Sequence, residues 1–195
     1  MIVTGATSGF GLATAKKFKE NGDLVIAVSR NAKKTEDVVR TYGFAAGFSM
    51  DVSDYSRWQE LKAFVTEKFG RIDVLVNNAG GGIAIADVTD QKEKDIDAAI
   101  SVNLNSVIYG CSVFGKMMKE QKDGVIVNIS SVCAKHAWQG WSVYAAAKAG
   151  VLNFTKGLYV ELRPFGVRAT CVIPASSSTG FQKNANIGET HDSLT

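Results

Sequence analysis

Residues 4–11 read Thr-Gly-Ala-Thr-Ser-Gly-Phe-Gly, and this glycine-rich stretch decides the fold of the chain. It lies between a short apolar run at residues 1–4, which predicts a β-strand, and residues 12–19, where apolar side chains recur at helical spacing. Glycines at such a junction permit a tight turn, and they let backbone N–H groups approach a pyrophosphate at the positive end of a helix. An ordinary strand-to-helix turn is the alternative, but the position directly after the first strand favours nucleotide binding.

Short apolar runs alternate with longer segments of helical period along the rest of the chain. We predict further strands at residues 24–29, 44–50, 72–76, 124–129 and 167–173, and further helices at residues 33–40, 57–69, 96–118 and 141–162. Strands joined by helices in this way run parallel, and their continuously apolar sequences are typical of a sheet covered on both faces. The predicted fold class is therefore α/β: a Rossmann-type doubly wound parallel sheet in three α/β/α layers, forming a single domain over residues 1–195.

Composition excludes several classes of protein. The chain is 46% hydrophobic and 21% charged, which supplies enough apolar material for a sizeable core. The 22 Lys and Arg exceed the 19 Asp and Glu by three, too few to indicate binding to nucleic acid or to a membrane surface. Three scattered cysteines and two histidines predict neither a disulfide framework nor a metal site. With no signal-peptide pattern and no apolar run of membrane-spanning length, we expect a cytoplasmic protein.

Three motifs occur in a fixed order. The glycine-rich stretch is followed by Asn-Asn-Ala-Gly at residues 77–80, after the fourth predicted strand, and by Tyr144-x-x-x-Lys148 on the last predicted helix. This order and spacing resemble the short-chain dehydrogenase/reductase family, in its single-domain branch, from Thr4 to about Thr179. The resemblance implies a seven-stranded parallel sheet that binds a nicotinamide dinucleotide along the carboxyl ends of its strands. It also implies an enzyme that interconverts a carbonyl and a secondary alcohol by hydride transfer. We expect the fold of residues 1–195 to lack the family's last helix and strand.

The Tyr/Lys pair indicates how the proton moves. Tyr144 and Lys148 are four residues apart on a helix, so both side chains share one face. A useful general acid/base needs a pKa nearer 7 than the ordinary 10 of tyrosine, a shift worth roughly 4 kcal/mol. A neighbouring ammonium and the positive charge of the oxidised nicotinamide can stabilise the phenolate by a free energy of this order. The resemblance implies that Ser131 holds the substrate oxygen, that Lys148 also bonds the nicotinamide ribose, and that Asn103 holds a water in the proton relay. The adjacent Ser130 should point the other way on an extended strand.

The end of the second predicted strand bears on the choice of cofactor. Dinucleotide folds place there a carboxylate that holds the adenosine ribose hydroxyls, whereas this chain reads Ser29-Arg30-Asn31. Arg30 resembles the arginine that meets the 2′-phosphate in NADP-preferring relatives, and the missing carboxylate removes repulsion. Lys33 and Lys34 could add to the positive field. A solvated basic loop is the alternative, and Ser8 stands where some NADP-preferring relatives carry a basic residue. We expect NADP(H) to be preferred over NAD(H).

The resemblance implies one set of cofactor-binding positions. Asp51 and Val52 match the family's adenine-binding pair, and Pro174 and Thr179 match its pattern after the sixth strand, where Ala175 replaces a glycine. The full set is Gly5, Thr7, Ser8, Gly9, Phe10, Gly11, Ser29, Arg30, Asn31, Asp51, Val52, Asn78, Ala79, Gly80, Tyr144, Lys148, Pro174 and Thr179.

The substrate and the partners are less closely defined by the sequence. Residues 132–142 should line the substrate cleft, where Trp138 and Trp141 are either walls of an apolar pocket or buried packing. We expect a small-molecule carbonyl or alcohol as substrate. The alternatives are a 3-oxoacyl-thioester (acyl-carrier-protein) reductase and a catalytically silent dinucleotide-binding regulatory protein. Apolar residues around the helices at 96–118 and 141–162 predict a homodimer or homotetramer that forms through them.

The C-terminal part carries two further expectations. Residues 168–173 would form an edge strand whose backbone groups lack a partner, which native proteins normally cover. We therefore expect that the sequence ending at Thr195 is incomplete, or lacks an element with which it normally folds. Residues 175–195 occupy the place of the family's mobile substrate lid.

Overall fold

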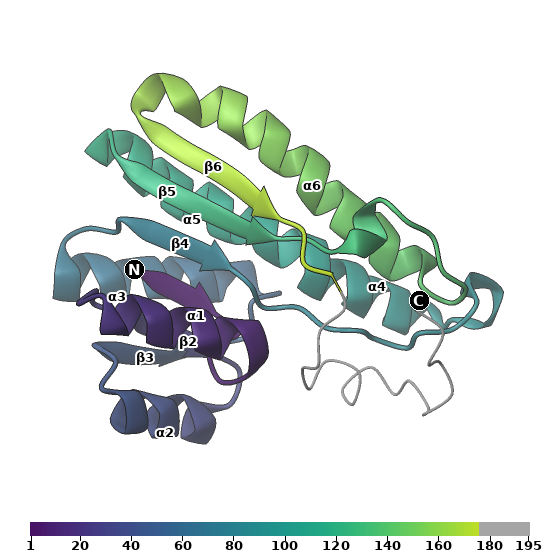
Figure 1. Cartoon of the computed structure of the whole chain (residues 1–195), viewed down its shortest axis with the longest axis horizontal. Coiled ribbons are helices and arrows are strands. Elements are labelled where there is room, and N and C mark those ends of the chain that lie inside the picture. Colours follow the sequence, from purple (N-terminus) through teal and green to yellow (C-terminus); the bar gives the residue numbers. More distant parts are fainter. Residues whose placement is uncertain (176–195) are drawn as a thin grey trace.

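The strands form one parallel sheet whose order places the first strand in the middle. The computed structural model describes residues 1–175, and in that part of the chain six strands are ordered β3-β2-β1-β4-β5-β6. Their bounds are β1 Ile2–Thr4, β2 Ile26–Ser29, β3 Ala46–Ser49, β4 Val74–Asn77, β5 Gly124–Ile129 and β6 Val167–Val172. Every neighbouring pair is parallel (Figure 1). The chain winds outward to β3 and then crosses back to β4, which opens a crevice at the carboxyl ends of β1 and β4.

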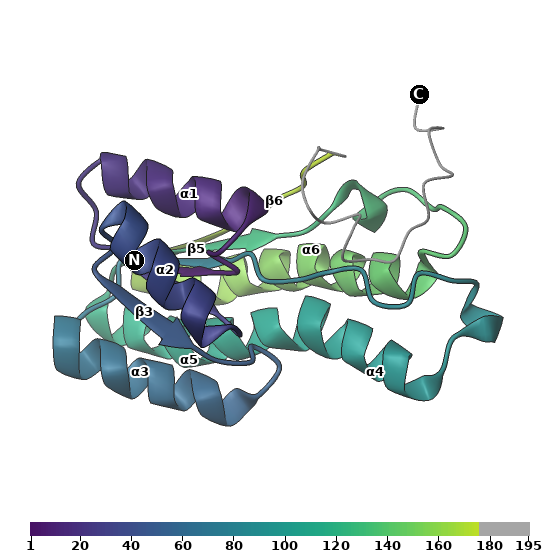
Figure 2. The same cartoon turned by 90° about the horizontal axis from the view of Figure 1, so that it is seen from below.

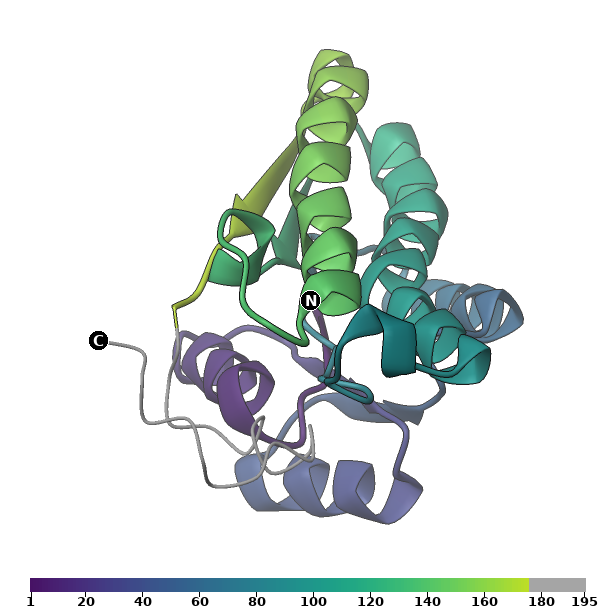
Figure 3. The same cartoon turned by 90° about the vertical axis from the view of Figure 1, so that its right-hand side faces the viewer.

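Helices cover both faces of this sheet. Helices α1 (Gly9–Glu20) and α2 (Ala32–Tyr42) lie on one face, and α3 (Tyr55–Phe69), α5 (Ser106–Gln121) and α6 (Ser142–Leu162) lie on the other (Figures 2 and 3). The larger core layer contains Trp58 and Phe114, both fully buried, whose rings meet edge to face with centroids 6.3 Å apart. Burial of an aromatic side chain of this size contributes about 2–3 kcal/mol. The predicted three-layer α/β/α fold is confirmed.

The predicted helix at residues 96–118 differs from the observed one. Helix α4 (Glu93–Ile100) passes through a π-helical turn, η2 (Ser101–Asn105), before it continues as α5. Such single π turns in a helix are frequent at functional sites. By length and composition alone, the run Glu93–Gln121 is the one described helix that could cross a membrane. Half of its most apolar 18-residue stretch is buried in the protein, and α5 packs on α3, β4 and β5 as a core helix does.

A buried polar network connects β4 and β5 to helix α6. The side-chain amide of Asn77 donates to Oδ1 of Asn128 (2.9 Å), and the amide of Asn128 donates to the Thr155 hydroxyl (2.9 Å). Thr155 in turn donates to the carbonyl of Val151, one turn earlier on α6. Cys111 lies beside both asparagines, and burial raises the pKa of its thiol to about 12. Because buried amides are costly without partners, this network favours one register between the sheet and α6.

All six predicted strands and the five predicted helical regions occur within the described residues, with ends that differ by a few positions. Three short 3-10 turns, at Val88–Asp90, Val132–Ala134 and Arg163–Phe165, were not predicted. Strand β6 lies at an edge of the sheet formed by residues 1–175, and its Val172 is 46% exposed. Thr179 and the predicted lid, apart from Ala175, lie outside the described residues.

Candidate active site

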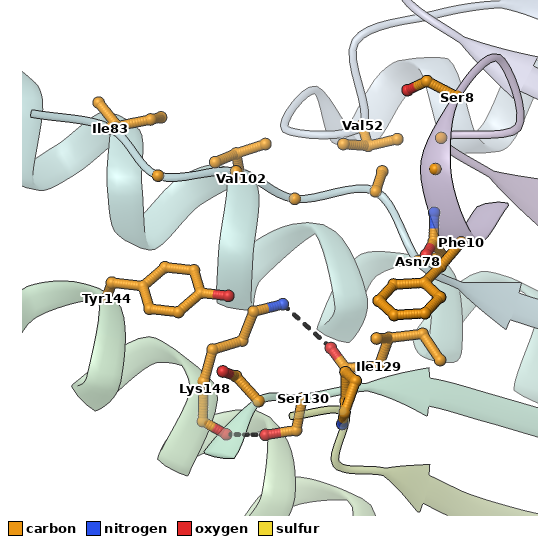
Figure 4. Close-up of a pocket in the computed structure, with 18 of the residues that line it drawn as sticks. Ser8, Phe10, Val52, Asn78, Ile83, Val102, Ile129, Ser130, Tyr144 and Lys148 are labelled. Atoms are coloured by element: carbon orange, nitrogen blue, oxygen red, sulfur yellow. Dashed lines mark hydrogen bonds between the residues drawn. The ribbon is translucent and has the colours of Figure 1, made fainter. Parts of the chain in front are cut away.

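The carboxyl ends of the strands border a cleft of about 1080 Å³. Its lining comes from the glycine-rich turn, from the residues that follow β2, β3, β4 and β5, and from helix α6 (Figure 4). Of the predicted cofactor and catalytic positions that the structure describes, all line this cleft except Gly11 and Asn103. The topology thus brings together residues that are far apart in the sequence.

The glycine-rich turn and the Asn-Asn-Ala-Gly stretch are joined through Thr4. The Thr4 hydroxyl accepts hydrogen bonds from the backbone N–H groups of Asn78 and Ala79, each at 2.9 Å, and the Asn78 amide donates to the Thr4 carbonyl. Gly11 packs beneath this junction: a Cβ there would lie 2.3 Å from the Gly5 carbonyl oxygen. Gly11 therefore allows the close approach of turn and helix.

The start of helix α1 suits a phosphate group. Gly5 and Gly9 both have positive φ, at 68° and 52°, which bends the chain sharply into the helix. Ser8 is the N-cap residue, yet its side chain makes no capping hydrogen bond. The first N–H groups of α1 are therefore not occupied by the cap, and Ser8, Gly9 and Phe10 line the cleft. An uncapped helix N-terminus of this kind is a ready anion site.

Tyr144, Lys148 and Ser131 meet in the middle of the cleft. Tyr144 is buried and hydrogen-bonded to the Ser131 side chain. Lys148 Nζ donates to the carbonyl of Ile129 at 3.0 Å and lies 5.8 Å from the centre of the Tyr144 ring (Figure 4). The Ser130 hydroxyl instead donates to the carbonyl of Lys148 at 2.8 Å. The two serines thus point apart, and it is Ser131 whose hydroxyl reaches the tyrosine.

Burial changes the pKa of both titrating groups. It lowers the pKa of Lys148 to about 8 from an ordinary 10.5 and raises the pKa of Tyr144 to about 12. The hydrogen bond from Ser131 opposes this rise but does not overcome it. In the protein alone, desolvation of the phenolate outweighs this hydrogen bond; the expected shift of the pKa toward 7, which includes the charge of a bound oxidised nicotinamide, stays a prediction. At neutral pH Tyr144 is therefore protonated, and Lys148 is still mostly a cation.

Asn103 lies behind the cleft in the π-helical turn and is fully buried. Its amide donates to the carbonyls of Gly81 (2.8 Å) and Ala99 (2.9 Å), and its Oδ1 accepts from the Gly81 N–H (3.0 Å). Both amide N–H groups are thus occupied within the protein. The side chain clamps the backbone that follows β4, and a Cβ on Gly80 would lie 2.8 Å from Asn103 Oδ1 and 3.3 Å from Lys148 Nζ.

Charged residues gather at the end of the cleft beside β2. Ser29, Arg30 and Asn31 all line it there, and so do Lys34 and Asp51. The Ser29 hydroxyl is hydrogen-bonded to the Thr35 hydroxyl at 2.7 Å, which holds it at the start of α2. Burial acts to raise the pKa of Asp51, but hydrogen bonds from Ser53 and the nearby Arg30 hold that pKa below its ordinary value.

Of the two lysines expected to add to the positive field, Lys34 lines the cleft of the described chain and Lys33 does not. Sequence reasoning missed other lining residues. Ile83 and Val102 could not have been found from any motif, because they lie in a loop and in the unexpected π turn. Across residues 1–175, no group of three or more His, Cys, Asp or Glu is placed to hold a metal ion.

Comparison with known proteins defines the family. The sequence matches the short chain dehydrogenase family over residues 1–190. The serine 3-dehydrogenase of Agrobacterium fabrum is 34% identical over 182 residues, which cover 93% of this chain and 73% of that enzyme. The 3-oxoacyl-(acyl-carrier-protein) reductase of Thermotoga maritima is 37% identical over 182 residues, covering 91% of this chain and 74% of the reductase.

Solved structures agree with these sequence relatives. A metagenomic short-chain oxidoreductase in complex with NADP has a TM-score of 0.85 at 34% identity, covering 90% of this chain and 81% of that one. A short chain dehydrogenase/reductase from Burkholderia phymatum in complex with NAD has a TM-score of 0.89 at 30% identity, covering 95% and 68%. Relatives with either cofactor share the fold, so the fold alone does not choose between them.

A doubly wound sheet with a glycine-rich first turn and a buried Tyr/Lys pair defines an oxidoreductase that uses a nicotinamide dinucleotide. The chain belongs to the short-chain dehydrogenase family. Its residues fit such a cofactor: the uncapped start of α1 suits the pyrophosphate, and cationic side chains lie at the far end of the same cleft.

Proposed function

We propose that this protein is an NADP(H)-dependent oxidoreductase that interconverts a carbonyl and a secondary alcohol, with Tyr144 as general acid/base. The observation that carries the proposal is the meeting of Tyr144, Ser131 and the buried Lys148 in the same cleft as the glycine-rich turn. We also propose that the protein acts in the cytoplasm, and that one domain both binds the cofactor and carries out the reaction. Measuring NADPH consumption with a panel of carbonyl compounds, including a 3-oxoacyl thioester, tests it. A chain that binds NADPH but oxidises it with none of them would instead be a regulatory protein.

Each residue of the group has a distinct task. The bound cofactor supplies the hydride. Ser131 donates a hydrogen bond to the substrate oxygen and aligns it with the Tyr144 hydroxyl. Tyr144, which is protonated at neutral pH, gives its proton to the oxygen as negative charge develops there. Lys148 holds the nicotinamide ribose and stabilises the resulting phenolate through its positive charge. Asn103 keeps the backbone after β4 in place behind both.

Preference for NADP(H) rests on the charges beside β2. Arg30 and Lys34 line the cleft there, and the acid that would repel a phosphate is replaced by Ser29. A guanidinium binds phosphate through two parallel hydrogen bonds, and a lysine in the first turn of α2 adds a second cation. Asp51 is the nearby carboxylate, but it is engaged by Ser53.

Exchanging these charges is expected to reverse the cofactor preference. In the double variant Ser29→Asp, Arg30→Ala, the ratio of kcat/KM for NADPH to that for NADH should fall at least about 100-fold, because a repulsive carboxylate replaces a cation that pairs with the phosphate. Steady-state kinetics with both cofactors measure the ratio. Lys33→Ala is the matched control, since Lys33 does not line the cleft within residues 1–175. An unchanged ratio in the double variant would refute the assignment.

Alkaline pH is expected to reduce kcat/KM for NADPH. The pKa of Lys148 is about 8, so its positive charge is lost from the free enzyme as pH rises through that value. Loss of one proton predicts a fall of about tenfold per pH unit above it. Initial rates between about pH 6 and pH 10 measure this dependence. A kcat/KM that stays level to pH 10 would contradict the role of the lysine cation.

The stability of the fold should change in the opposite direction. Because the pKa of Lys148 is lowered in the folded state, the unfolded chain binds more protons between pH 8 and 10.5. The contribution of this residue to the free energy of unfolding therefore rises with pH in that window. Denaturant unfolding of the wild type and of Lys148→Met across this pH range measures the contribution as a difference in the free energy of unfolding. The same data show whether a fall in activity at high pH comes from loss of the lysine charge or from unfolding of the protein.

We also propose that copies of the chain associate through α5 and α6. Helix α6 exposes Tyr159 and Val160, at 42% and 69% of their surface, among the described residues. Exposed apolar side chains on a long helix are what an interface between copies would bury, whereas Val113 and Phe114 of α5 are already buried within the fold.

A further inference from the structure

The two ends of the cleft differ in charge. Beside β2 it is lined by the cations Arg30 and Lys34 and by Asp51. Toward the Tyr144 end, Ile83 lies on the opposite side from Ser8 and Phe10 (Figure 4). There the described lining residues include Ala98, Val102, Cys133, Trp138, Gln139 and Trp141, and none of them carries a formal charge. Apart from the buried Lys148, the described side chains that a molecule beside Tyr144 would meet are apolar or neutral.

Two tryptophans contribute aromatic surface to this end of the cleft. The Trp141 ring meets the Tyr144 ring edge to face, with centroids 5.4 Å apart and an angle of 76°. Trp138 lies 5.8 Å from the His136 ring, and both tryptophans are half-buried while lining the cleft. The sequence left two readings open for these side chains, pocket wall or buried packing, and their exposure to the cleft supports the first.

The loop that carries the tryptophans is held against a second loop. The Gln139 amide donates to the Asp87 carboxylate at 3.2 Å, and a Cβ on Gly140 would lie 3.4 Å from the Ala86 backbone. The amide of Gln91 donates to the Ala86 carbonyl from the other side. These contacts hold the tryptophan-bearing loop against residues 86–91.

We propose that this subsite takes a neutral ketone, or the matching secondary alcohol, that carries an aromatic or alicyclic group, and that Trp138 is a specificity-determining residue. The inference rests on the proposed function. Indole rings bind flat apolar groups through area and edge contacts. A substrate with a carboxylate or sulfonate beside the carbonyl would place that charge among apolar side chains, where the lining from residues 1–175 offers no cation besides Lys148, which is unfavourable. Lys148 is not available to pair with such an anion, because its ammonium is buried and donates to the carbonyl of Ile129.

A matched pair of substrates tests the charge preference. 1-Phenylpropane-1,2-dione and phenylglyoxylate share a benzoyl group, and they differ by a neutral acetyl group in place of a carboxylate. With NADPH and the wild-type protein, kcat/KM should be at least about 100-fold higher for the neutral dione. An equal or higher value for phenylglyoxylate would overturn the inference.

Variants of Trp138 test which wall recognises the ring. Trp138→Ala should lower kcat/KM for the phenyl dione at least about tenfold, mainly through KM, because it removes the surface that the ring contacts. The same variant should leave kcat/KM for butane-2,3-dione within about threefold, since that small ketone does not reach the indole. Trp138→Phe, which keeps an aromatic ring, should retain most of the preference. An equal loss with both diones would show a structural role and would contradict the proposal.

Binding without turnover separates this inference from the proposed function. Calorimetry on Tyr144→Phe with NADPH bound should give tighter binding of the phenyl dione than of phenylglyoxylate. If that preference holds while the wild type oxidises no NADPH, the proposed function fails and the subsite assignment stands. If the two ligands bind equally, the subsite assignment fails whatever the turnover.

Discussion

Replacement of Tyr144 by Phe is expected to lower kcat by about 1000-fold or more, because the change removes the only hydroxyl proposed to protonate the substrate oxygen. That loss corresponds to about 4 kcal/mol of transition-state stabilisation. The phenyl ring keeps the packing against Trp141, so the fold should be retained. The dissociation constant for NADPH should stay within about threefold, since binding depends on the glycine-rich turn and on Lys148. Stopped-flow and steady-state assays of NADPH oxidation measure the first effect, and fluorescence titration measures the second.

The same helix offers a control for this variant. Tyr159 lies four turns further along α6 and is 42% exposed, so Tyr159→Phe should leave both kcat and NADPH affinity unchanged. If Tyr144→Phe turned over within about tenfold of the wild type, a difference of roughly 1.4 kcal/mol, the general-acid role would be refuted.

Replacement of Lys148 by Met is expected to damage both binding and chemistry. Methionine fills a similar buried volume but has no ammonium to bond the ribose, to donate to the Ile129 carbonyl or to stabilise the Tyr144 phenolate. We expect kcat to fall at least about 100-fold and the dissociation constant for NADPH to rise about tenfold, or roughly 1.4 kcal/mol. The joint loss distinguishes this residue from Tyr144, whose replacement should affect kcat alone.

Lys156 provides the comparison for the lysine variant. It lies on the same helix with its side chain exposed, so Lys156→Met removes an equal charge from α6 without touching the cleft. Unchanged NADPH affinity in Lys148→Met, or equal effects in the two lysine variants, would contradict the proposed contact with the ribose.

Much of this site could be predicted from local sequence patterns. The alternation of apolar runs with helical segments defined the sheet, and the i, i+4 spacing placed Tyr144 and Lys148 on one face of α6. Ser131 could be distinguished from Ser130 because neighbours on an extended strand point to opposite sides, and the observed hydrogen bonds of the two serines agree.

Other features arise from contacts that no local pattern contains. The π turn at Ser101–Asn105 adds a residue within an apolar run that reads as one continuous helix. The raised pKa of Tyr144 comes from burial, which the charge argument from Lys148 and the oxidised nicotinamide did not include. The contact of Gln139 with Asp87 joins residues 52 positions apart, and neither residue belongs to a motif.

The hydrogen bonds between β5 and α6 have a consequence for how such a protein diversifies. Lys148 donates to the main-chain carbonyl of Ile129 on the strand, and Ser130 donates to the main-chain carbonyl of Lys148 on the helix. Because both acceptors are main-chain atoms, neither hydrogen bond depends on the identity of the accepting residue. Residues 132–141 lie in the sequence between these two attachment points. Their side chains can therefore be replaced, in evolution or by mutagenesis, while Ser131, Tyr144 and Lys148 keep their positions. We therefore expect new substrate ranges to arise from substitutions within these ten residues rather than from changes throughout the protein.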